Sequence, residues 1–224
     1  MSINKAAYQE ITDYLGLHKV QLIAVSKTKP NHDILDLHQL GQKDFGENYV
    51  QELVEKATVL PQDIRWHFIG HLQSNKVKYI APFVYLIHGV DSEKLLIEIN
   101  KQAQKNNRII DVLLQVHIAS EETKFGFDEL SLLEFIQSGR LNQYAHIRLR
   151  GLMGMASFSD NQHLVQTEFT HLKSSFIKAK HILNSTHFDQ LSMGMSSDYQ
   201  LAIVQGSTMV RIGSLLFGAR NYNK

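Results

Sequence analysis

The feature that most constrains the fold of this sequence is a regular alternation of short β-branched runs with longer segments whose apolar residues recur at helical spacing. The predicted strands are 20–28, 44–47, 65–69, 85–90, 110–118, 147–155, 190–195 and 209–217. The predicted helices are 3–15, 34–40, 50–60, 92–106, 130–138, 164–183 and 199–204. Strand-then-helix order implies parallel strands with right-handed crossovers, and eight such units can close on themselves. The pattern therefore predicts an α/β fold, a (β/α)8 barrel of TIM type, with an open doubly wound sheet as the alternative.

Nothing in the sequence divides the chain into separate domains. Its 224 residues, 43% of them hydrophobic, are enough to bury one substantial core. Only three prolines occur, and no stretch rich in Gly, Ser and Pro marks a linker. We therefore expect residues 1–224 to form a single domain.

The charge balance and the absence of cysteine limit the classes of function. Lys and Arg number 23 against 22 Asp and Glu, so no basic excess indicates nucleic acid or a membrane surface as a partner. The apolar runs are far shorter than the roughly 20 residues that span a bilayer. No cysteine is present, which fits a reducing compartment. These observations predict a cytoplasmic protein whose partner is a small molecule.

In a barrel of this type, functional side chains belong at the carboxyl ends of the strands. Lys27 stands at the end of the first predicted strand, on the same face as Ile23 and Val25 by the two-residue period. Partial burial there would lower the pKa of the amine and favour attack on an aldehyde. Lys29 is the weaker candidate, because it already belongs to the loop before Pro30. The simpler alternative is that Lys27 ends the strand and extends to water.

The last two predicted strands end in small and hydroxyl-bearing residues that resemble a phosphate site. The candidates are Ser196, Ser197, Gly213 and Ser214. Barrels commonly bind phosphate through the loops after strands seven and eight, where helix N-termini favour anions. The alternative is that Gly194 and Gly213 only permit tight turns.

Two further polar residues are expected near the same rim. Arg211, if it faces inward, is a buried cation that needs a partner, either a carboxylate such as Glu47 or a ring nitrogen of a ligand. Asn48 follows the second strand and is either a ligand contact or a helix N-cap. His67 and His71 do not share a helical face and have no acidic residue in their tract, so no metal site is predicted.

Taken together, several tracts resemble the pyridoxal phosphate homeostasis protein family over essentially the whole chain and in the order of that family. The tracts are 24–30, 45–52, 66–76, 121–126, 150–153, 192–198 and 210–213. The resemblance implies a fold-type III barrel that binds pyridoxal 5′-phosphate (PLP), similar to the N-terminal domain of alanine racemases. Lys27 matches the lysine that forms the Schiff base, and Arg211 the arginine that faces the pyridine nitrogen. The other matches are Asn48 near the cofactor and Ser196, Ser197, Gly213 and Ser214 at its phosphate.

The family resemblance also implies a role, which is to carry or buffer PLP and so to support vitamin B6 and amino-acid homeostasis without catalysis. Expected partners are PLP and apo forms of PLP-dependent enzymes, and the protein is expected to be a monomer. The alternative function is a PLP-dependent amino-acid racemase or related enzyme, which would need a second base such as His67 or Tyr49. A phosphosugar-binding barrel is a more distant alternative. Lys124 is a candidate for a transit position during cofactor loading.

Overall fold

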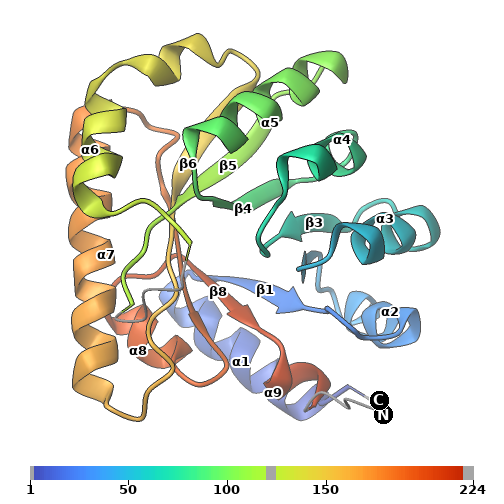
Figure 1. The fold of residues 1–224 in the computed structure, drawn as a ribbon. Helices are drawn as coiled ribbons and strands as arrows, with labels where there is room; N and C mark the ends of the chain where they lie inside the picture. The colour runs from blue at the N-terminus through green and yellow to red at the C-terminus, as the bar shows by residue number, and fades with distance from the viewer. Residues whose placement is uncertain (1–2, 120–124, 219–224) are drawn as a thin grey trace.

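The computed structural model describes residues 3–119 and 125–218, and their strands form a closed parallel barrel (Figure 1). Its strands are β1 (Gln21–Val25), β2 (Asp44–Glu47), β3 (Arg65–Phe68), β4 (Leu86–Val90), β5 (Ile110–Gln115), β6 (Ile147–Met153), β7 (Gln190–Met195) and β8 (Met209–Ile212). Each strand pairs with its neighbours in sequence order, and β8 pairs with β1 from Gln21 with Met209 to Ala24 with Ile212. The barrel prediction is therefore confirmed, and the open-sheet alternative is wrong because β1 and β8 have no free edge.

Helices surround the barrel on its outer side (Figure 1). They are α1 (Lys5–His18), α2 (Asn31–Gln39), α3 (Val50–Val59), α4 (Val77–Ile80), α5 (Glu93–Lys105), α6 (Glu129–Gln137), α7 (Gln162–Leu183), α8 (Tyr199–Val204) and α9 (Ser214–Phe217), with short 3-10 turns at Ser74–Lys76 and Arg140–Gln143. Several helix starts follow from side-chain caps, as where Ser92 accepts from Leu95 N and Asp128 accepts from Ser131 N. None of the described helices is long and apolar enough to cross a membrane.

The predicted final strand, 209–217, is wrong beyond Ile212. The chain leaves the sheet at Gly213 and turns into α9, where Leu216 N and Phe217 N both donate to Gly213 O. Leu216 and Phe217 are buried against the outer layer, so the apolar run reflects a helical face and not a continued strand. The predicted strands that start at 20, 110 and 147 also run two or three residues too far at their carboxyl ends. After β5 and β6 apolar residues continue into the loop, whereas β1 is followed by the polar residues 26–28.

The core has two parts, one between strands and helices and one inside the barrel. The outer part includes Phe45, Leu53 and Phe169, all with no exposed surface. The inner part is a small apolar cluster made by Ile23, Leu86, Leu113, Met153 and Met209. Buried polar side chains share the barrel interior with this cluster, among them His67, His88, Ser192 and Arg211. This inner polarity is unusual for buried positions, which favour apolar side chains.

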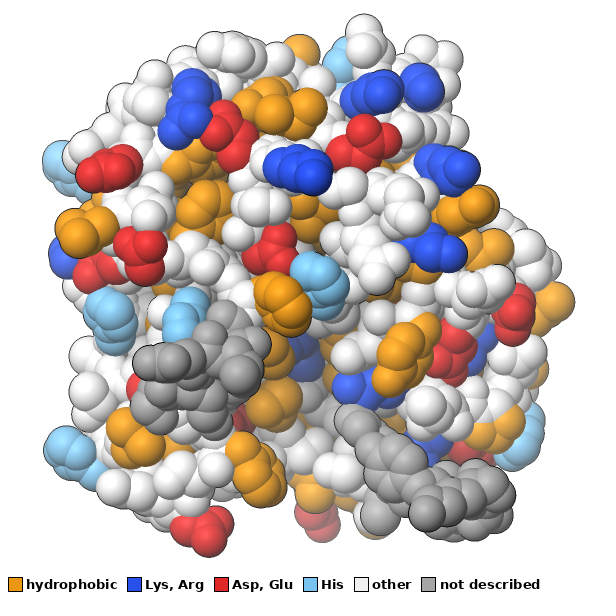
Figure 2. Space-filling view, viewed as in Figure 1, with side chains coloured by type: hydrophobic (Ala, Val, Ile, Leu, Met, Phe, Trp, Pro, Cys, Tyr) orange, Lys and Arg blue, Asp and Glu red, His pale blue; other side chains and the backbone are white. Residues whose placement is uncertain are grey.

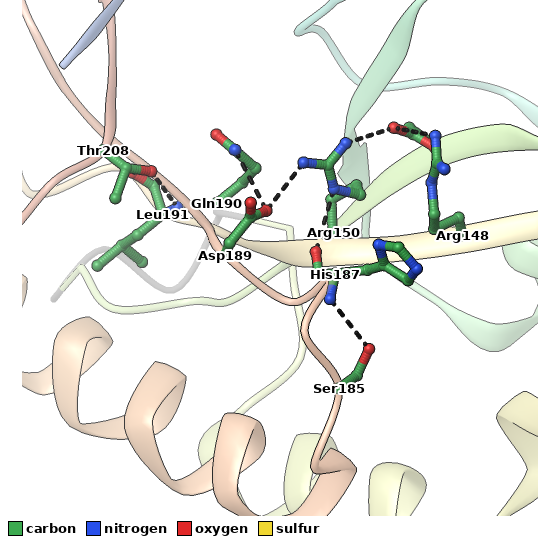
Figure 3. A network of polar contacts seen from close by, with 9 residues as sticks. Arg148, Arg150, Ser185, His187, Asp189, Gln190, Leu191 and Thr208 are labelled. Carbon is green, nitrogen blue, oxygen red and sulfur yellow. Dashed lines mark hydrogen bonds and ion pairs between the residues drawn. The ribbon is translucent and has the colours of Figure 1, made fainter. Parts of the chain in front are cut away.

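The amino ends of the strands carry a network of ion pairs (Figure 3). Asp111 at the start of β5 accepts from Arg148 Nε at 2.7 Å and from Arg150 Nη1 at 2.8 Å, both on β6. Arg150 also donates to Asp189, directly before β7, at 2.9 Å. The network links three consecutive strands at the end of the barrel opposite to the predicted site. Such contacts stabilise the barrel and leave its other end for binding.

Candidate functional site

The loops at the carboxyl ends of the strands surround a cavity of about 470 Å³. Its lining includes every predicted site residue: Lys27, Asn48, Ser196, Ser197, Arg211, Gly213 and Ser214. These residues come from the ends of β1, β2, β7 and β8, so the fold brings together side chains that lie far apart in the sequence. The volume is within the range of pockets that enclose small molecules.

Lys27 is half-buried and lies two residues beyond the end of β1. Val25 and Lys27 line the cavity, and Ile23 belongs to the apolar cluster inside the barrel. The three side chains thus lie along the interior side of β1, as the two-residue period predicts. Lys29 also lines the cavity, but its Nζ donates to Phe217 O at 2.8 Å and Gly218 O at 3.3 Å.

A buried cluster of charged side chains from β2 and α3 anchors the turn that carries Lys27. Ser26 Oγ donates to Glu47 Oε1 at 2.6 Å, and Lys56 Nζ donates to Ser26 O and to Glu47 Oε1, both at 2.8 Å. Glu52 accepts from Lys56 and from Thr28 N, each at 2.6 Å. Burial raises the pKa of Glu47, although Lys56 opposes the rise. These bonds hold the backbone on both sides of Lys27 in place.

Arg211 on β8 has an exposed fraction of only 4%. Its Nη1 donates to Ser192 Oγ at 2.6 Å, and its Nη2 donates to Gly154 O at 3.1 Å. Burial lowers the pKa of Arg211 to about 10, against attraction from Asp198, so the guanidinium remains a cation at neutral pH. Of the two alternatives for Arg211, the pairing with Glu47 is wrong, because Glu47 contacts Ser26 and Lys56 instead.

The two hydroxyl-bearing loops meet at one side of the cavity. Gly213 N donates to Ser196 Oγ at 3.3 Å, which joins the loop after β7 to the loop after β8. Ser197 and Ser214 are exposed at the cavity lining. Gly194 has a φ of +94°, and a Cβ there would lie 2.6 Å from that of Ala202. The tight-turn interpretation is therefore right for Gly194, while Gly213, whose φ is −124°, lines the cavity.

Asn48 is positioned by close packing of two backbones. A Cβ on Gly70 would lie 2.4 Å from Asn48 O, so only glycine lets the loop after β3 approach the loop after β2 this closely. The N-cap alternative for Asn48 is wrong, since α3 begins at Val50 with Tyr49 as its cap residue. Asn48 Oδ1 is buried, and no hydrogen-bond partner for it exists among the described residues. A buried acceptor of this kind is suited to a ligand that donates to it.

A larger cavity of about 800 Å³ adjoins the first and shares Phe158, Met195, Ser196 and Ser197 with it. Its described lining contains Tyr14, Asp160 and Asp198 but neither Lys nor Arg. It therefore offers no amine or guanidinium for an aldehyde or an anion. The smaller cavity, which has both, is the candidate site.

Comparison with known proteins agrees with this choice. A family model described as the alanine racemase N-terminal domain matches residues 5–221. The pyridoxal phosphate homeostasis protein of Pasteurella multocida is 41% identical over 208 residues, which cover 92% of this chain and 88% of that protein. The one of Aquifex aeolicus is 40% identical over 208 residues, with 92% and 90% covered. The chain belongs to the pyridoxal phosphate homeostasis protein family.

Solved structures place the fold in the same family. PipY of Synechococcus elongatus, solved without PLP, matches with a TM-score of 0.88 at 34% identity over 95% of this chain and 99% of that one. PipY with PLP bound matches with a TM-score of 0.83 at 32% identity, with 95% and 100% covered. Alanine racemase from Bartonella henselae is 17% identical with a TM-score of 0.70 and shares the barrel fold.

The candidate second bases of the racemase alternative do not reach the cavity of this homeostasis family member. His67 is fully buried and contacts Asp44 and His88, while Tyr49 is 58% exposed and outside the lining. Among the described residues, no group of three or more His, Asp or Glu side chains is arranged to hold a metal ion. Lys124 lies outside the described residues.

Sequence reasoning missed the residues that hold the site together. Glu52 and Lys56 are four apart on α3, a spacing that favours an ion pair, so this part was detectable. The contact of Lys56 with Glu47 and Ser26 depends on how three elements pack, and no local pattern signals it. Phe158, 92% exposed at the cavity, likewise has no periodic signal in its loop.

Proposed function

We propose that this chain binds PLP in the 470 Å³ cavity through a Schiff base on Lys27, and that it carries or buffers the cofactor in vitamin B6 and amino-acid homeostasis. The observation that carries the proposal is the convergence of all seven predicted residues on one cavity. The names of the relatives and the PLP-bound PipY structure support the same ligand. When bound, PLP supplies an aldehyde that amines attack and a ring that can accept electrons.

The side chains at the cavity match the groups of PLP one by one. The amine of Lys27 suits the aldehyde, and the hydroxyls of Ser197 and Ser214 suit the phosphate. Arg211 suits the pyridine nitrogen as a donor. The buried Asn48 Oδ1 can accept a hydrogen bond from the ligand. The group therefore fits the residues present.

The carrier role is favoured over the racemase alternative by the lining of the cavity. An arginine cation beside the pyridine nitrogen discourages its protonation, which makes the ring a poorer electron sink. Racemisation also needs a proton-transfer group on each face of the substrate, yet the described lining contains no His, Tyr, Asp or Glu. Lys29 is present there but donates to two backbone carbonyls.

The remaining parts of the proposal concern the setting. We infer that the protein works in the cytoplasm as a monomer and delivers PLP to apo forms of PLP-dependent enzymes. The cysteine-free sequence and the nearly even charge support a reducing compartment and a small-molecule ligand. Acidic and basic side chains are interspersed on the face in Figure 2, which favours this reading over a nucleic-acid surface.

Borohydride reduction of the purified protein tests the assignment of the lysine. We expect a visible absorption band that disappears on reduction, with the cofactor then attached covalently to Lys27 in a peptide map. Lys27→Ala should lose the band and the adduct. Lys29→Met is the matched control, because it removes the other described amine at the cavity and should leave the adduct on Lys27. An adduct on Lys29, or none in the wild type, would overturn the proposal.

A further inference from the structure

A linear chain of hydrogen-bonded side chains, the file, crosses the interior of the barrel from Arg211 on β8 to Asp44 on β2. Arg211 Nη1 contacts Ser192 Oγ at 2.6 Å, and Ser192 Oγ contacts His88 Nδ1 at 3.0 Å. His88 Nε2 contacts His67 Nδ1 at 3.0 Å, and His67 Nε2 contacts Asp44 Oδ1 at 3.0 Å. The five side chains come from five different strands, so only the closed barrel assembles them.

Every member of this file is buried. Ser192, His67 and His88 have no exposed surface, and Arg211 and Asp44 are 4% and 5% exposed. Five buried polar side chains are costly unless their hydrogen bonds are satisfied. A wholly apolar interior would be the simpler way to fill a barrel. The file therefore calls for a functional explanation.

The two ends of the file determine where its protons lie. Arg211 can only donate, so Ser192 Oγ accepts from it and still has its own hydrogen to donate, with His88 Nδ1 at 3.0 Å. At the other end, Asp44 is bound by Arg65 and His67, and these bonds leave the pKa of its carboxyl below the ordinary value although burial raises it. As a carboxylate, Asp44 only accepts, so His67 Nε2 carries the hydrogen of that bond.

The two imidazoles donate in the same direction, toward Asp44. Burial lowers the pKa of both His67 and His88, so each is neutral and carries one hydrogen. With Nε2–H on His67, its Nδ1 must accept, and His88 Nε2–H donates to it. His88 Nδ1 then accepts from Ser192. The assignment that starts at Asp44 thus ends on a hydroxyl that accepts from Arg211 and donates to His88, with no mismatched donor or acceptor.

The aligned dipoles of these groups stabilise the positive charge of Arg211. No carboxylate forms an ion pair with Arg211 among the described residues, although Asp198 attracts it. Each neutral member of the file turns its acceptor atom toward Arg211 and its donor atom toward Asp44. The aligned dipoles favour a cation at one end and an anion at the other. The other ionisable neighbours are Arg65, on Asp44, and Tyr85, whose ring lies 5.4 Å from that of His67.

We propose that Ser192, His88 and His67 are positioning residues, which form a one-directional hydrogen-bond relay that fixes the charge and orientation of Arg211 toward the occupant of the cavity. The inference rests on the proposed function, since that occupant is PLP. Ser192 is the member next to Arg211, and its hydroxyl has to accept from the guanidinium and donate to His88 at once. A hydroxyl does both through a single oxygen atom.

The proton positions are testable without any cofactor. Nitrogen-15 NMR of the PLP-free protein distinguishes a protonated from an unprotonated ring nitrogen, because the two resonate far apart. We expect His67 and His88 both to carry their hydrogen on Nε2 at neutral pH, with Nδ1 unprotonated. Either histidine found with its hydrogen on Nδ1, or as a cation, would overturn the relay.

The effect on Arg211 is testable with PLP. Ser192→Ala removes the bond to Arg211 and is expected to weaken PLP binding about tenfold and to shift the absorption maximum of the bound cofactor. Ser192→Thr keeps the hydroxyl and should bind within about threefold of the wild type. Ser175→Ala is the matched control, since Ser175 is a fully buried serine on α7 that is not part of the described lining. Equal affinity and an unchanged spectrum in Ser192→Ala would refute the positioning role.

The two tests separate this inference from the proposed function. If the wild type binds no PLP, the proposed function fails and the NMR result still decides the proton positions. If the wild type binds PLP on Lys27 but the histidines have other tautomers, only the relay fails. Should Ser192→Ala not fold, the wild-type NMR experiment alone still decides the relay.

Discussion

At the scale of single residues, three serines line the cavity but differ in what their hydroxyls already contact. Ser196 Oγ accepts from Gly213 N and so joins two loops. For Ser197 and Ser214, the described residues provide no hydrogen-bond partner at the hydroxyl, and both side chains are exposed at the lining. A free hydroxyl at a cavity is available to a phosphate, whereas an engaged one mainly supports the loop.

Ser197→Ala and Ser214→Ala should therefore each weaken PLP binding by about tenfold without lowering the melting temperature, since each removes one hydrogen bond to a charged acceptor. Fluorescence titration measures the affinity, and circular dichroism follows unfolding. Ser74→Ala is the control, because Ser74 begins the 3-10 turn Ser74–Lys76 and lies outside the described lining. If both variants bind like the wild type, the phosphate lies elsewhere.

The residues that sequence could identify are those that a strand end places by itself. Lys27 follows an apolar run, and the loops at 196–197 and 213–214 follow two more, so barrel topology alone assigns them to one rim. The hydrogen-bonded file through His67 and His88 was out of reach. Its members lie on five strands, and their contacts depend on which side chains meet across the barrel, which no spacing in the sequence encodes.

At the scale of elements, the order of strands and helices was predictable, while most of their ends were not. Strands 44–47 and 190–195 and helix 199–204 have the predicted bounds, because polar or small residues mark both ends. The short α4 and α9 were missed, since one turn of helix is too brief to show a period. The segment after Gln115 was predicted as strand because its apolar residues continue the pattern of β5.

Helices α6 and α7 are joined by a contact with a defined dependence on pH. Glu129 on α6 accepts from Lys178 at 2.8 Å and contacts His171 at 2.9 Å, both on α7. The bonds with Lys178 and then His171 lower the pKa of Glu129 to about 2. A carboxyl whose pKa is lower in the folded state stabilises it above the ordinary value of 4.5, and this stabilisation is lost as the pH falls toward 2.

Glu129→Gln should thus lower the melting temperature at neutral pH and make it less sensitive to pH between about 4.5 and 2. Thermal unfolding of both proteins across that range measures the difference. Glu134→Gln, an exposed position on the same helix, should follow the wild-type curve. Parallel curves for the wild type and Glu129→Gln would show that the contact contributes nothing.

At the scale of the whole molecule, the two ends of the barrel differ in their use of charge. The carboxyl ends of the strands surround the cavity, and the amino ends carry the ion pairs of Asp111 with Arg148 and Arg150 (Figure 3). Asp111 is buried, with its side chain 9% exposed, while the two arginines are 45% and 22% exposed. Removing the carboxylate would leave two neighbouring cations without their shared partner.

Asp111→Asn should accordingly lower the free energy of unfolding by about 1–3 kcal/mol while PLP affinity stays within about twofold of the wild type. Urea denaturation and fluorescence titration measure the two quantities separately. Glu55→Gln is the control, because this exposed carboxylate has no ion pair among the described residues. A large loss of PLP affinity in Asp111→Asn would show that the two ends of the barrel are coupled.

The pairing of β1 with β8 has a consequence for how the protein folds during its synthesis. Within the barrel, β1 is synthesised before all the other strands and has to wait for β8 before the barrel can close. The cavity depends on the same closure, because Lys27 follows β1 while Arg211 and Ser214 belong to the final stretch of the chain. Contacts between such distant parts of a sequence form late in folding. On the proposed function, a chain whose barrel is not yet closed exposes Lys27 without the loops that complete the PLP site, so retention of the cofactor would report closure of the barrel.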